Sequence, residues 1–217
     1  TRTPLLIFRR GAGERLNFII MTINYTISNN IAILSWNMTS SPMNVLNDES
    51  VPAFGAALEK AYSDADVRGI IITSDKPEFV AGADLKMILR NQNENPAEIL
   101  KISVELNQLF RKIETNGKPV VAAINGTALG GGLEICLACH YRVALDNPKT
   151  KLGLPEVKVG LLPGGGGTQR LPRMIGMQAA LPLMFAGLKI GLTTALRVHV
   201  KKCSKKPRLG LSRILNP

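Results

Sequence analysis

The stretch Lys118-Pro-Val-Val-Ala-Ala-Ile-Asn-Gly-Thr-Ala-Leu-Gly-Gly-Gly-Leu-Glu134 decides the fold of this chain. Its first part, residues 119–124, is an uninterrupted apolar run, which is typical of a strand covered on both faces. The strand stops at Asn125-Gly126, and the glycine triplet opens a short apolar helix over residues 133–138. Residues 141–145 return to a strand pattern. This alternation of strand, helix and strand predicts an α/β fold.

The alternation continues on both sides of this stretch. Two short runs that flank Asn29-Asn30 indicate a β-hairpin, and Asp48 is placed to cap a helix that ends near Ser63. A second buried strand precedes a long amphipathic helix, whose apolar residues recur every three or four positions. The expected ranges are 23–27 and 31–36 for the hairpin strands, 68–73 for the second buried strand, 99–113 for the long helix, and 171–175 and 178–186 for two short helices.

The charge of the chain is concentrated near its two ends. The 217 residues carry a formal net charge of +11, yet residues 21–187 hold equal numbers of basic and acidic side chains. Because nucleic-acid binding needs a basic surface on the folded body, we expect no nucleic-acid partner. The sequence also lacks a run of about 18 uncharged apolar residues, so we expect no membrane span.

Two loops end at small residues whose peptide N–H groups have no evident acceptor. One is Val80-Ala-Gly-Ala-Asp84 and the other is the triplet 130–132, and each precedes an expected helix. Free N–H groups at a helix start, together with the helix dipole, favour an oxyanion. For either loop alone, tight packing of strand against helix is the more common explanation.

Two glutamates lie in apolar surroundings. Glu134 is in the first turn of the expected apolar helix, and Glu156 follows Pro155 between apolar residues and a glycine-rich segment. Burial favours the neutral form of a carboxyl group, which suits general acid and base catalysis near neutral pH. The simpler alternative makes Glu134 a partner of the helix dipole and Glu156 a surface residue.

Several motifs suggest a phosphate, dinucleotide, haem or metal site but do not meet the requirements of such a site. The glycine run 164–167 lacks both the Lys-Ser/Thr of a phosphate-binding loop and the spacing of a dinucleotide fingerprint. Cys136-Leu-Ala-Cys139-His140 matches the C-x-x-C-H of covalent haem attachment, but it lies in an apolar helix that we expect to be buried. No grouping of residues has metal-ligand spacing, so we expect no metal.

Three motifs, taken in order, resemble one known family. They are residues 79–86, residues 118–134 and residues 152–172. The sequence resembles the crotonase (enoyl-CoA hydratase/isomerase) superfamily, and is most similar to the N-terminal hydratase part of the multifunctional α subunit of fatty-acid β-oxidation. The resemblance covers about residues 21–187 and implies a crotonase-like spiral of ββα units.

The resemblance also implies roles for particular residues. The N–H groups of Ala83 and Gly131 would form an oxyanion hole, and Glu134 and Glu156 would be the catalytic pair. The implied reaction is hydration of trans-2-enoyl-CoA to 3-hydroxyacyl-CoA, with no cofactor besides the coenzyme A of the substrate. The Ala81 carbonyl would accept from the adenine of coenzyme A, and Gly164 would help to hold the water. Isomerisation of enoyl-CoA, or acyl-CoA binding without turnover, are the alternatives.

The two ends depart from the family pattern. We expect residues 1–20 to be a non-native or disordered basic extension, residues 21–187 to be the hydratase core, and residues 188–217 to be an aberrant basic tail without stable structure. The family implies homotrimers, hexamers or an α/β complex, which this C-terminal sequence puts in doubt. The expected compartment is the bacterial cytoplasm, with the mitochondrial matrix as the alternative.

Overall fold

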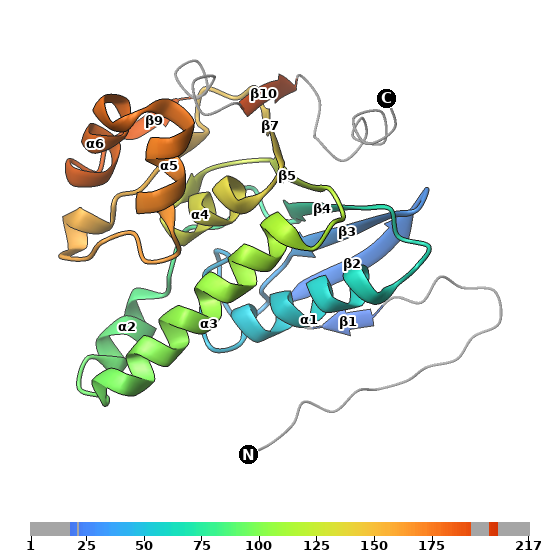
Figure 1. The fold of residues 1–217 in the computed structure, drawn as a ribbon, viewed down its shortest axis with the longest axis horizontal. Helices are drawn as coiled ribbons and strands as arrows, with labels where there is room; N and C mark the ends of the chain where they lie inside the picture. The colour runs from blue at the N-terminus through green and yellow to red at the C-terminus, as the bar shows by residue number, and fades with distance from the viewer. Residues whose placement is uncertain (1–17, 21, 192–199, 204–217) are drawn as a thin grey trace.

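A mixed β-sheet with helices on one face forms the body of the protein. The computed structural model describes residues 18–20, 22–191 and 200–203. Within these residues the main sheet has seven strands in the order β1-β2-β3-β4-β5-β7-β10 (Figure 1). The strands are β1 Phe18–Ile20, β2 Ile23–Ser28, β3 Ile31–Trp36, β4 Gly69–Ser74, β5 Val120–Ile124, β7 Tyr141–Leu145 and β10 Val200–Cys203. The prediction of an α/β fold is confirmed.

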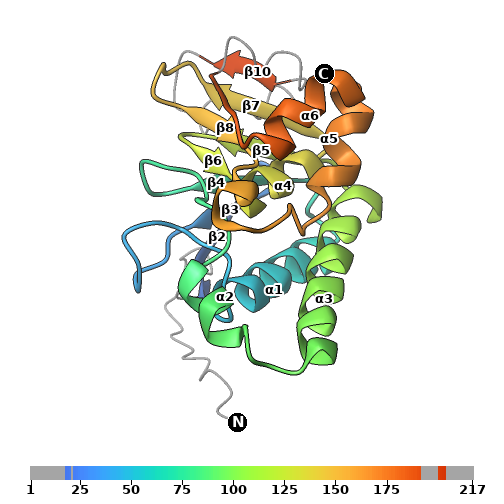
Figure 2. The same cartoon turned by 90° about the vertical axis from the view of Figure 1, so that its left-hand side faces the viewer.

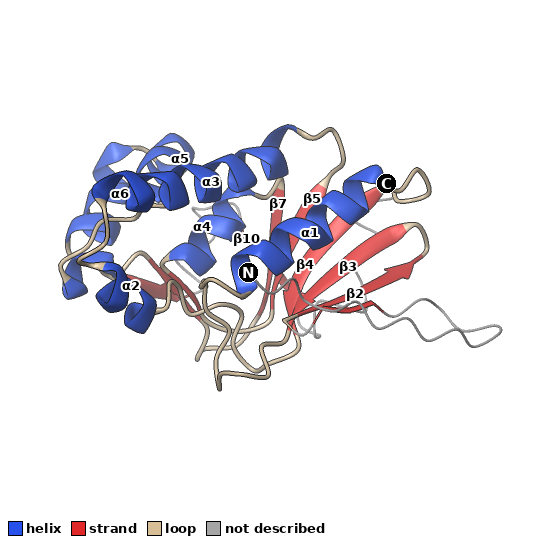
Figure 3. Ribbon diagram, turned by 90° about the horizontal axis from the view of Figure 1, so that it is seen from below, coloured by secondary structure: helices blue, strands red, loops and turns tan. Residues whose placement is uncertain are grey.

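The central strands are buried on both faces, as their apolar sequences predict. Every residue of β4 and of β5 is buried, and the two strands run parallel with Ile70 opposite Val120. Figure 3 shows α1, α3 and α4 on one face of the sheet, where Ile70, Ile72 and Ala122 join the large hydrophobic core. The alternate side chains of the same strands form a second, smaller cluster with Ile31 and Val143. Covered strands of this kind place their carboxyl ends at one edge of the sheet.

Seven helical segments accompany the sheet in the part of the chain that the structure describes. Figure 2 shows α5 and α6 packed side by side, and α5 also contacts α4. The first of these two begins at Gly167, earlier than the predicted start at Leu171. The helices are α1 Ser50–Ser63, α2 Leu85–Asn91, α3 Pro96–Thr115, α4 Gly131–Ala138, the 3₁₀-helix η1 Glu156–Val159, α5 Gly167–Ile175 and α6 Met177–Phe185.

The hairpin is confirmed, but the predicted cap of α1 is wrong. Asn29 and Asn30 both have positive φ, 51° and 62°, as the tight turn between β2 and β3 requires. At α1, the side-chain oxygen of Asn47 accepts from the backbone amides of Glu49 and Ser50. Asp48 instead pairs with Arg90 on the surface. Asn and Asp are nearly equivalent as caps, so sequence alone does not distinguish these neighbours.

Helix α3 is amphipathic as predicted, but its apolar face is buried only in the C-terminal half. Phe110 and Ile113 are fully buried, whereas Ile99 and Ile102 are 39% and 47% exposed. The sheet lies beneath the C-terminal half of the helix, while the N-terminal half extends past it beside α2 (Figure 1). A periodic pattern predicts the face of a helix, and the length of the layer beneath it decides how much of that face is covered.

A second, small sheet lies beside the carboxyl ends of the main strands. It has the order β6-β8-β9, formed by Ala128–Leu129, Lys151–Gly153 and Lys189–Gly191. Strands β6 and β8 are parallel, and β9 pairs antiparallel with β8. This sheet fixes the backbone that leads into α4 and into η1.

Three strands correct the expectations for the two ends. Strand β1 lies inside the range expected to be a disordered extension, and it pairs antiparallel with β2. Strands β9 and β10 lie inside the range 188–217 that we expected to lack stable structure, and β10 pairs parallel with β7. Strand pairing uses backbone groups, so short or lysine-rich runs can join a sheet edge without a strong apolar pattern. The rest of both expected extensions lies outside the described residues.

Candidate active site

The two loops with free amides lie side by side at the carboxyl ends of β4 and β5. The Leu129 amide donates to the Val80 carbonyl at 3.1 Å, and Val80 forms a parallel bridge with Ala128. A Cβ added to Gly82 would lie 3.7 Å from Gly130 Cα and 3.8 Å from the Gly131 nitrogen. The sequence therefore predicted two loops that the fold brings into contact.

The backbone around Ala83 is fixed by Leu46. The Leu46 amide donates to the Gly82 carbonyl at 2.8 Å, and the Asp84 amide donates to the Leu46 carbonyl at 2.9 Å. The Ala83 amide lies between these two bonds, and it has no acceptor among the described residues. The Gly131 amide, at the first position of α4, also lacks one there. A Cβ on Gly131 would lie 4.0 Å from the Ala83 nitrogen, so the two amides are neighbours.

The glycine triplet allows this close approach. Gly130 has φ of +52°, a conformation that favours glycine. A Cβ on Gly131 would overlap the side chain of Leu46, and a Cβ on Gly132 would overlap the carbonyl of Val80. The triplet thus places the N-terminus of α4 directly against the neighbouring loop. The two loops therefore hold two amides without acceptors close to each other.

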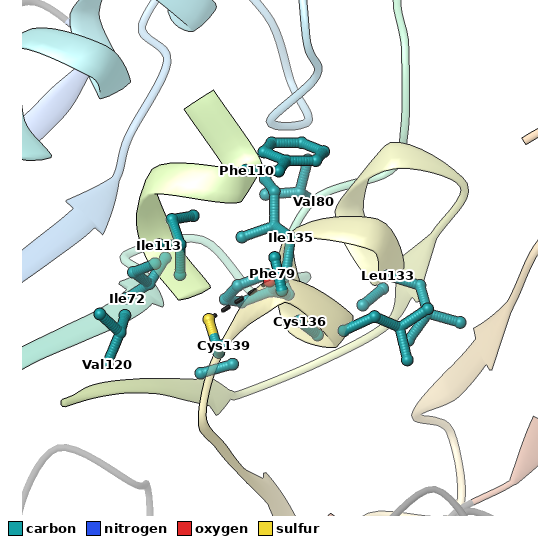
Figure 4. Close-up of a cluster of buried hydrophobic side chains, with 14 of the residues drawn as sticks. Ile72, Phe79, Val80, Phe110, Ile113, Val120, Leu133, Ile135, Cys136 and Cys139 are labelled. Carbon is teal, nitrogen blue, oxygen red and sulfur yellow. Dashed lines mark hydrogen bonds between the residues drawn. The ribbon is translucent and has the colours of Figure 1, made fainter. Parts of the chain in front are cut away.

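The body of α4 anchors this N-terminus in the core. All eight residues of α4 are buried. Figure 4 shows Leu133, Ile135 and Cys136 among the buried side chains of Phe79 and Phe110 from neighbouring elements. The Cys139 thiol donates to the Ile135 carbonyl, and the Cys136 thiol to that of Gly132, each at 3.2 Å. Burial raises the pKa of both thiols, to about 12 for Cys139. The cysteines therefore pack as core residues.

Glu134 is an almost fully buried carboxyl group on α4. Its side chain is 2% exposed, and its Oε1 accepts from the backbone amide of Gly167 at 2.7 Å. That amide is at the N-terminus of α5, where the helix dipole favours negative charge. Burial raises the pKa of Glu134, while the amides of Gly167 and Gly165 and the charge of Arg170 lower it in part. The Gly167 amide therefore holds the Glu134 carboxyl group in place, and burial removes this group from solvent.

Glu156 lies on the other side of the glycine triplet, at the first position of η1. A Cβ on Gly130 would lie 3.1 Å from its Oε1. Its Oε2 is buried and has no hydrogen-bond partner in the structure. Burial, together with repulsion from Glu134, raises the pKa of Glu156 to about 7. The alternative of a surface residue does not fit this buried oxygen.

Two glycines of the run 164–167 leave room for Glu134. A Cβ on Gly165 would lie 2.6 Å from Glu134 Oε2, and a Cβ on Gly167 would lie 2.9 Å from Oε1. Gly164 is exposed at the head of the run, and its carbonyl accepts from the Asn107 side chain at 2.7 Å. The sequence could only exclude a phosphate loop here; the run instead makes room for a carboxylate.

Ala81 and Asn44 complete the loop that carries Ala83. The Ala81 amide donates to the Asn44 carbonyl at 2.9 Å, and the Ala81 carbonyl accepts no hydrogen bond from the described residues. Asn44 is 1% exposed, and its side chain bonds four groups in three segments of the chain. They are the amide of Met38, the carbonyls of Trp36 and Phe79, and the hydroxyl of Ser74. Sequence reasoning missed Asn44, because a lone Asn in a polar loop carries no pattern.

Two further observations limit the chemistry of the described residues. They contain no group of three or more His, Cys, Asp or Glu side chains that could hold a metal ion. They also contain no helix of the length and apolarity that crossing a membrane requires.

Comparisons with known proteins agree with the resemblance read from the motifs. The model of the family described as Enoyl-CoA hydratase/isomerase matches residues 26–202. The fatty acid oxidation complex subunit alpha of Shewanella frigidimarina is 46% identical over 169 residues, which are 77% of this chain and 24% of that protein. The protein of the same name from Idiomarina loihiensis is 41% identical over 208 residues, which cover 85% of this chain and 29% of that protein. The chain spans about a quarter of the length of these relatives.

Solved structures agree as well. An enoyl-CoA hydratase from Thermoplasma volcanium matches with a TM-score of 0.82 at 25% identity, covering 91% of this chain and 78% of that one. An enoyl-CoA hydratase from Bacillus anthracis matches with a TM-score of 0.79 at 30% identity, covering 89% and 75%. The prediction of a crotonase-like fold is confirmed.

Proposed function

The chain belongs to the enoyl-CoA hydratase/isomerase family, and from this premise we propose that it adds water to trans-2-enoyl-CoA to form 3-hydroxyacyl-CoA in fatty-acid β-oxidation. The observation that carries the proposal is the placement of two carboxyl groups beside two free amides. Glu156 lies against Gly130 of the glycine triplet and Glu134 follows the triplet on α4, while the Gly131 amide lies within the triplet near that of Ala83.

The two amides suit the charge that develops in this reaction. Attack of water on C3 of an enoyl thioester moves electrons onto the carbonyl oxygen and produces an enolate. Donors that are in place before the reaction stabilise this charge without reorganisation, and one such donor contributes about 3 kcal/mol. We assign this role to the amides of Ala83 and Gly131.

The surroundings of the two carboxyl groups suit them to opposite tasks. Glu134 accepts from Gly167 and lies near the positive charge of Arg170, which favours its ionised form. Glu156 has a buried oxygen without a donor, and its pKa of about 7 leaves it largely protonated at slightly acidic pH. We therefore assign Glu134 as the base and Glu156 as the acid.

The proposed steps balance. Glu134 takes a proton from water while the water oxygen bonds to C3, the C2–C3 double bond becomes single and the enolate forms. Glu156 then delivers its proton to C2 as the enolate collapses to the thioester. The net change is addition of one water molecule, and proton exchange with solvent restores both carboxyl groups.

Two further residues receive binding roles in this proposal. The Ala81 carbonyl, which no described donor occupies, would accept from the adenine of coenzyme A. Gly164, exposed at the head of the glycine run, would help to hold the attacking water. The reaction as written uses no metal and no cofactor other than the coenzyme A of the substrate, so we expect a chelator to leave the rate unchanged.

The names of the relatives extend the proposal to assembly. They are α subunits of fatty acid oxidation complexes from bacteria, so we propose that this chain takes part in such a complex in a bacterial cytoplasm. Size measurement after mixing with the partner subunit of a related complex tests this point.

Loss of the conjugated enoyl-thioester absorbance tests the reaction directly. With a short-chain enoyl-CoA we expect turnover by the chain and a decrease of about 10²–10⁴-fold for Glu156→Gln. Asp48→Asn, which alters an exposed carboxylate paired with Arg90, is the matched control and should keep the rate. Full activity of Glu156→Gln would contradict the mechanism. Conversion of a 3-enoyl-CoA to the 2-enoyl isomer without hydration would favour isomerisation, and binding without any turnover would favour an acyl-CoA-binding protein.

A further inference from the structure

Arg170 connects the candidate site to α3. Its side chain is 13% exposed, and it makes contacts in two directions. Toward α3, its Nε and Nη2 donate to the two oxygens of Glu114, at 2.7 and 3.1 Å. Toward the site, its Nη1 donates to the Gly165 carbonyl at 2.8 Å. A guanidinium held in two directions in this way has a fixed position.

Gly165 lies between Arg170 and Glu134. Its Cα faces Glu134 so closely that a Cβ would lie 2.6 Å from Oε2, while its carbonyl is held by Arg170. The next residue, Gly166, has φ of +89°, and a Cβ there would overlap the Arg170 guanidinium. The glycine run is thus enclosed between a carboxylate on one side and a cation on the other.

We propose that Arg170 is a positioning residue for the hydration: it fixes the Gly165 peptide against Glu134 and places a cation against the glycine run that faces this glutamate. This inference rests on the proposed function, because it assumes that Glu134 acts as the base. It adds a residue that acts through Glu134 and the glycine run.

The charged groups around Glu134 and Arg170 determine in which direction a substitution changes the pKa of Glu134. Arg170 on α5 is the cation that lowers its pKa, and Glu134 in turn raises the pKa of Glu156 on η1. Behind Arg170, on α3, stand Glu114 and Arg111, which pair with each other at 3.0 Å. Helix α4 carries no other charged side chain. Changes at Arg170 and at Glu114 should therefore act on Glu134 in opposite directions.

The pH dependence of kcat/KM, measured with the full chain, tests the charge. Arg170→Gln keeps a donor but loses the cation, so we expect the acidic limb of the profile to move up by about one pH unit, with a loss that reaches about tenfold on the acidic side of the limb. Arg170→Lys keeps the cation and should leave the limb close to that of the unchanged chain. A purely structural role would lower the rate of both variants and leave the limb in place.

Glu114→Gln should move the acidic limb of the pH profile in the direction opposite to that of Arg170→Gln. Removing this carboxylate leaves the charge of Arg170 less neutralised, so the acidic limb should move to lower pH. Asn107→Ala is the matched control, because it removes a contact to the same glycine run, at the Gly164 carbonyl, without changing charge. Its limb should stay in place.

A second readout separates this inference from the proposed function. Titration of the ¹³C-labelled Glu134 carboxyl group by NMR, identified by its loss in Glu134→Gln, should show the same two opposite shifts without any turnover. Shifts of equal sign in Arg170→Gln and Glu114→Gln, or no shift in either, would overturn the inference. Absence of hydration by the unchanged chain would instead refute the proposed function. If Arg170→Gln does not fold, the direction of the Glu114→Gln shift decides.

Discussion

The two halves of the candidate site are built by different means. The amides of Ala83 and Gly131 belong to loops whose neighbouring backbone groups are bonded at 2.8 to 3.1 Å, and a free amide beside an open site can bond water or ligand. The carboxyl groups of Glu134 and Glu156 lie at least partly out of water, and burial raises the pKa of both. The backbone half is thus compatible with a stable fold, whereas the carboxyl half opposes it.

Because of this difference, the carboxyl groups that we propose for catalysis are also the groups whose burial costs stability. Burial of a carboxyl group costs free energy unless partners compensate. Glu134 has such partners in Gly167 and Arg170, while one oxygen of Glu156 has none. Substitutions in the two halves should therefore have different signatures in rate and in stability.

The largest expected effect lies in the carboxyl half. Glu134→Gln and Glu156→Gln should each lower kcat by about 10²–10⁴-fold, and the double variant should lose little more than the worse single one, because both serve one proton-transfer sequence. The measurement is kcat for hydration of a short-chain enoyl-CoA. Independent, multiplying losses would show that the two groups do not work together.

The second-largest loss of kcat is expected from a substitution that moves one of the two free amides. In Gly131→Ala the new Cβ overlaps Leu46, so the amide must move, and we expect a loss of about 10²–10³-fold in kcat. Adding Leu46→Ala removes the overlap and should restore part of the rate. Gly55→Ala is the control: its Cβ would meet Leu109 at an ordinary 3.7 Å, and kcat should not change.

The loop that supports the backbone half should show its effect in stability. Asn44→Ala leaves several buried groups without partners, and we expect the free energy of unfolding to fall by about 2–4 kcal/mol. Asn24, whose side chain bonds Asp75 at an exposed position, is the control, and its replacement by alanine should cost about 0.5 kcal/mol or less. Denaturant unfolding monitored by circular dichroism measures both.

The smallest expected effect is an increase in the free energy of unfolding, in contrast to the decrease expected for Asn44→Ala. The folded pKa of Glu156, about 7, lies above the unfolded value near 4.3, so its ionised form destabilises the fold. Below the unfolded pKa, the carboxyl group is neutral in both the folded and the unfolded state, so its burial causes no ionisation cost. The free energy of unfolding falls as the pH rises from there toward 7, and it stays low at higher pH. Glu156→Gln should thus stabilise the protein by about 1–2 kcal/mol at pH 8 and hardly at pH 4. Equal stabilisation at both pH values would contradict the burial of this carboxyl group.

Much of the fold was predictable because its signals are local. The buried strands β4 and β5 and the glycine-opened helix α4 follow from apolar runs and glycines in adjacent positions. Strands β1, β9 and β10 were missed because each joins an existing edge through backbone bonds, which side-chain patterns do not record.

The candidate site was predictable only in part, for the same reason. The motifs singled out both glutamates and both amide loops, but their contact depends on strands brought together by the fold. Asn44 lies in none of the motifs, and Arg170 lies in one of them without an assigned role, because their importance lies in partners far along the chain: Phe79 for the first and Glu114 for the second. Long-range hydrogen bonds leave no periodicity in the sequence.

The infrared carbonyl stretch of a bound enoyl thioester tests the central claim most directly. With crotonyl-CoA labelled by ¹³C at C1 and bound to Glu156→Gln, which should turn over slowly, two amide donors must polarise the carbonyl group. We predict a stretch at lower frequency than in water, which moves back when Gly131→Ala is added. A stretch at the frequency found in water, in a variant shown to bind the thioester, would contradict the claim that Ala83 and Gly131 converge on the carbonyl oxygen.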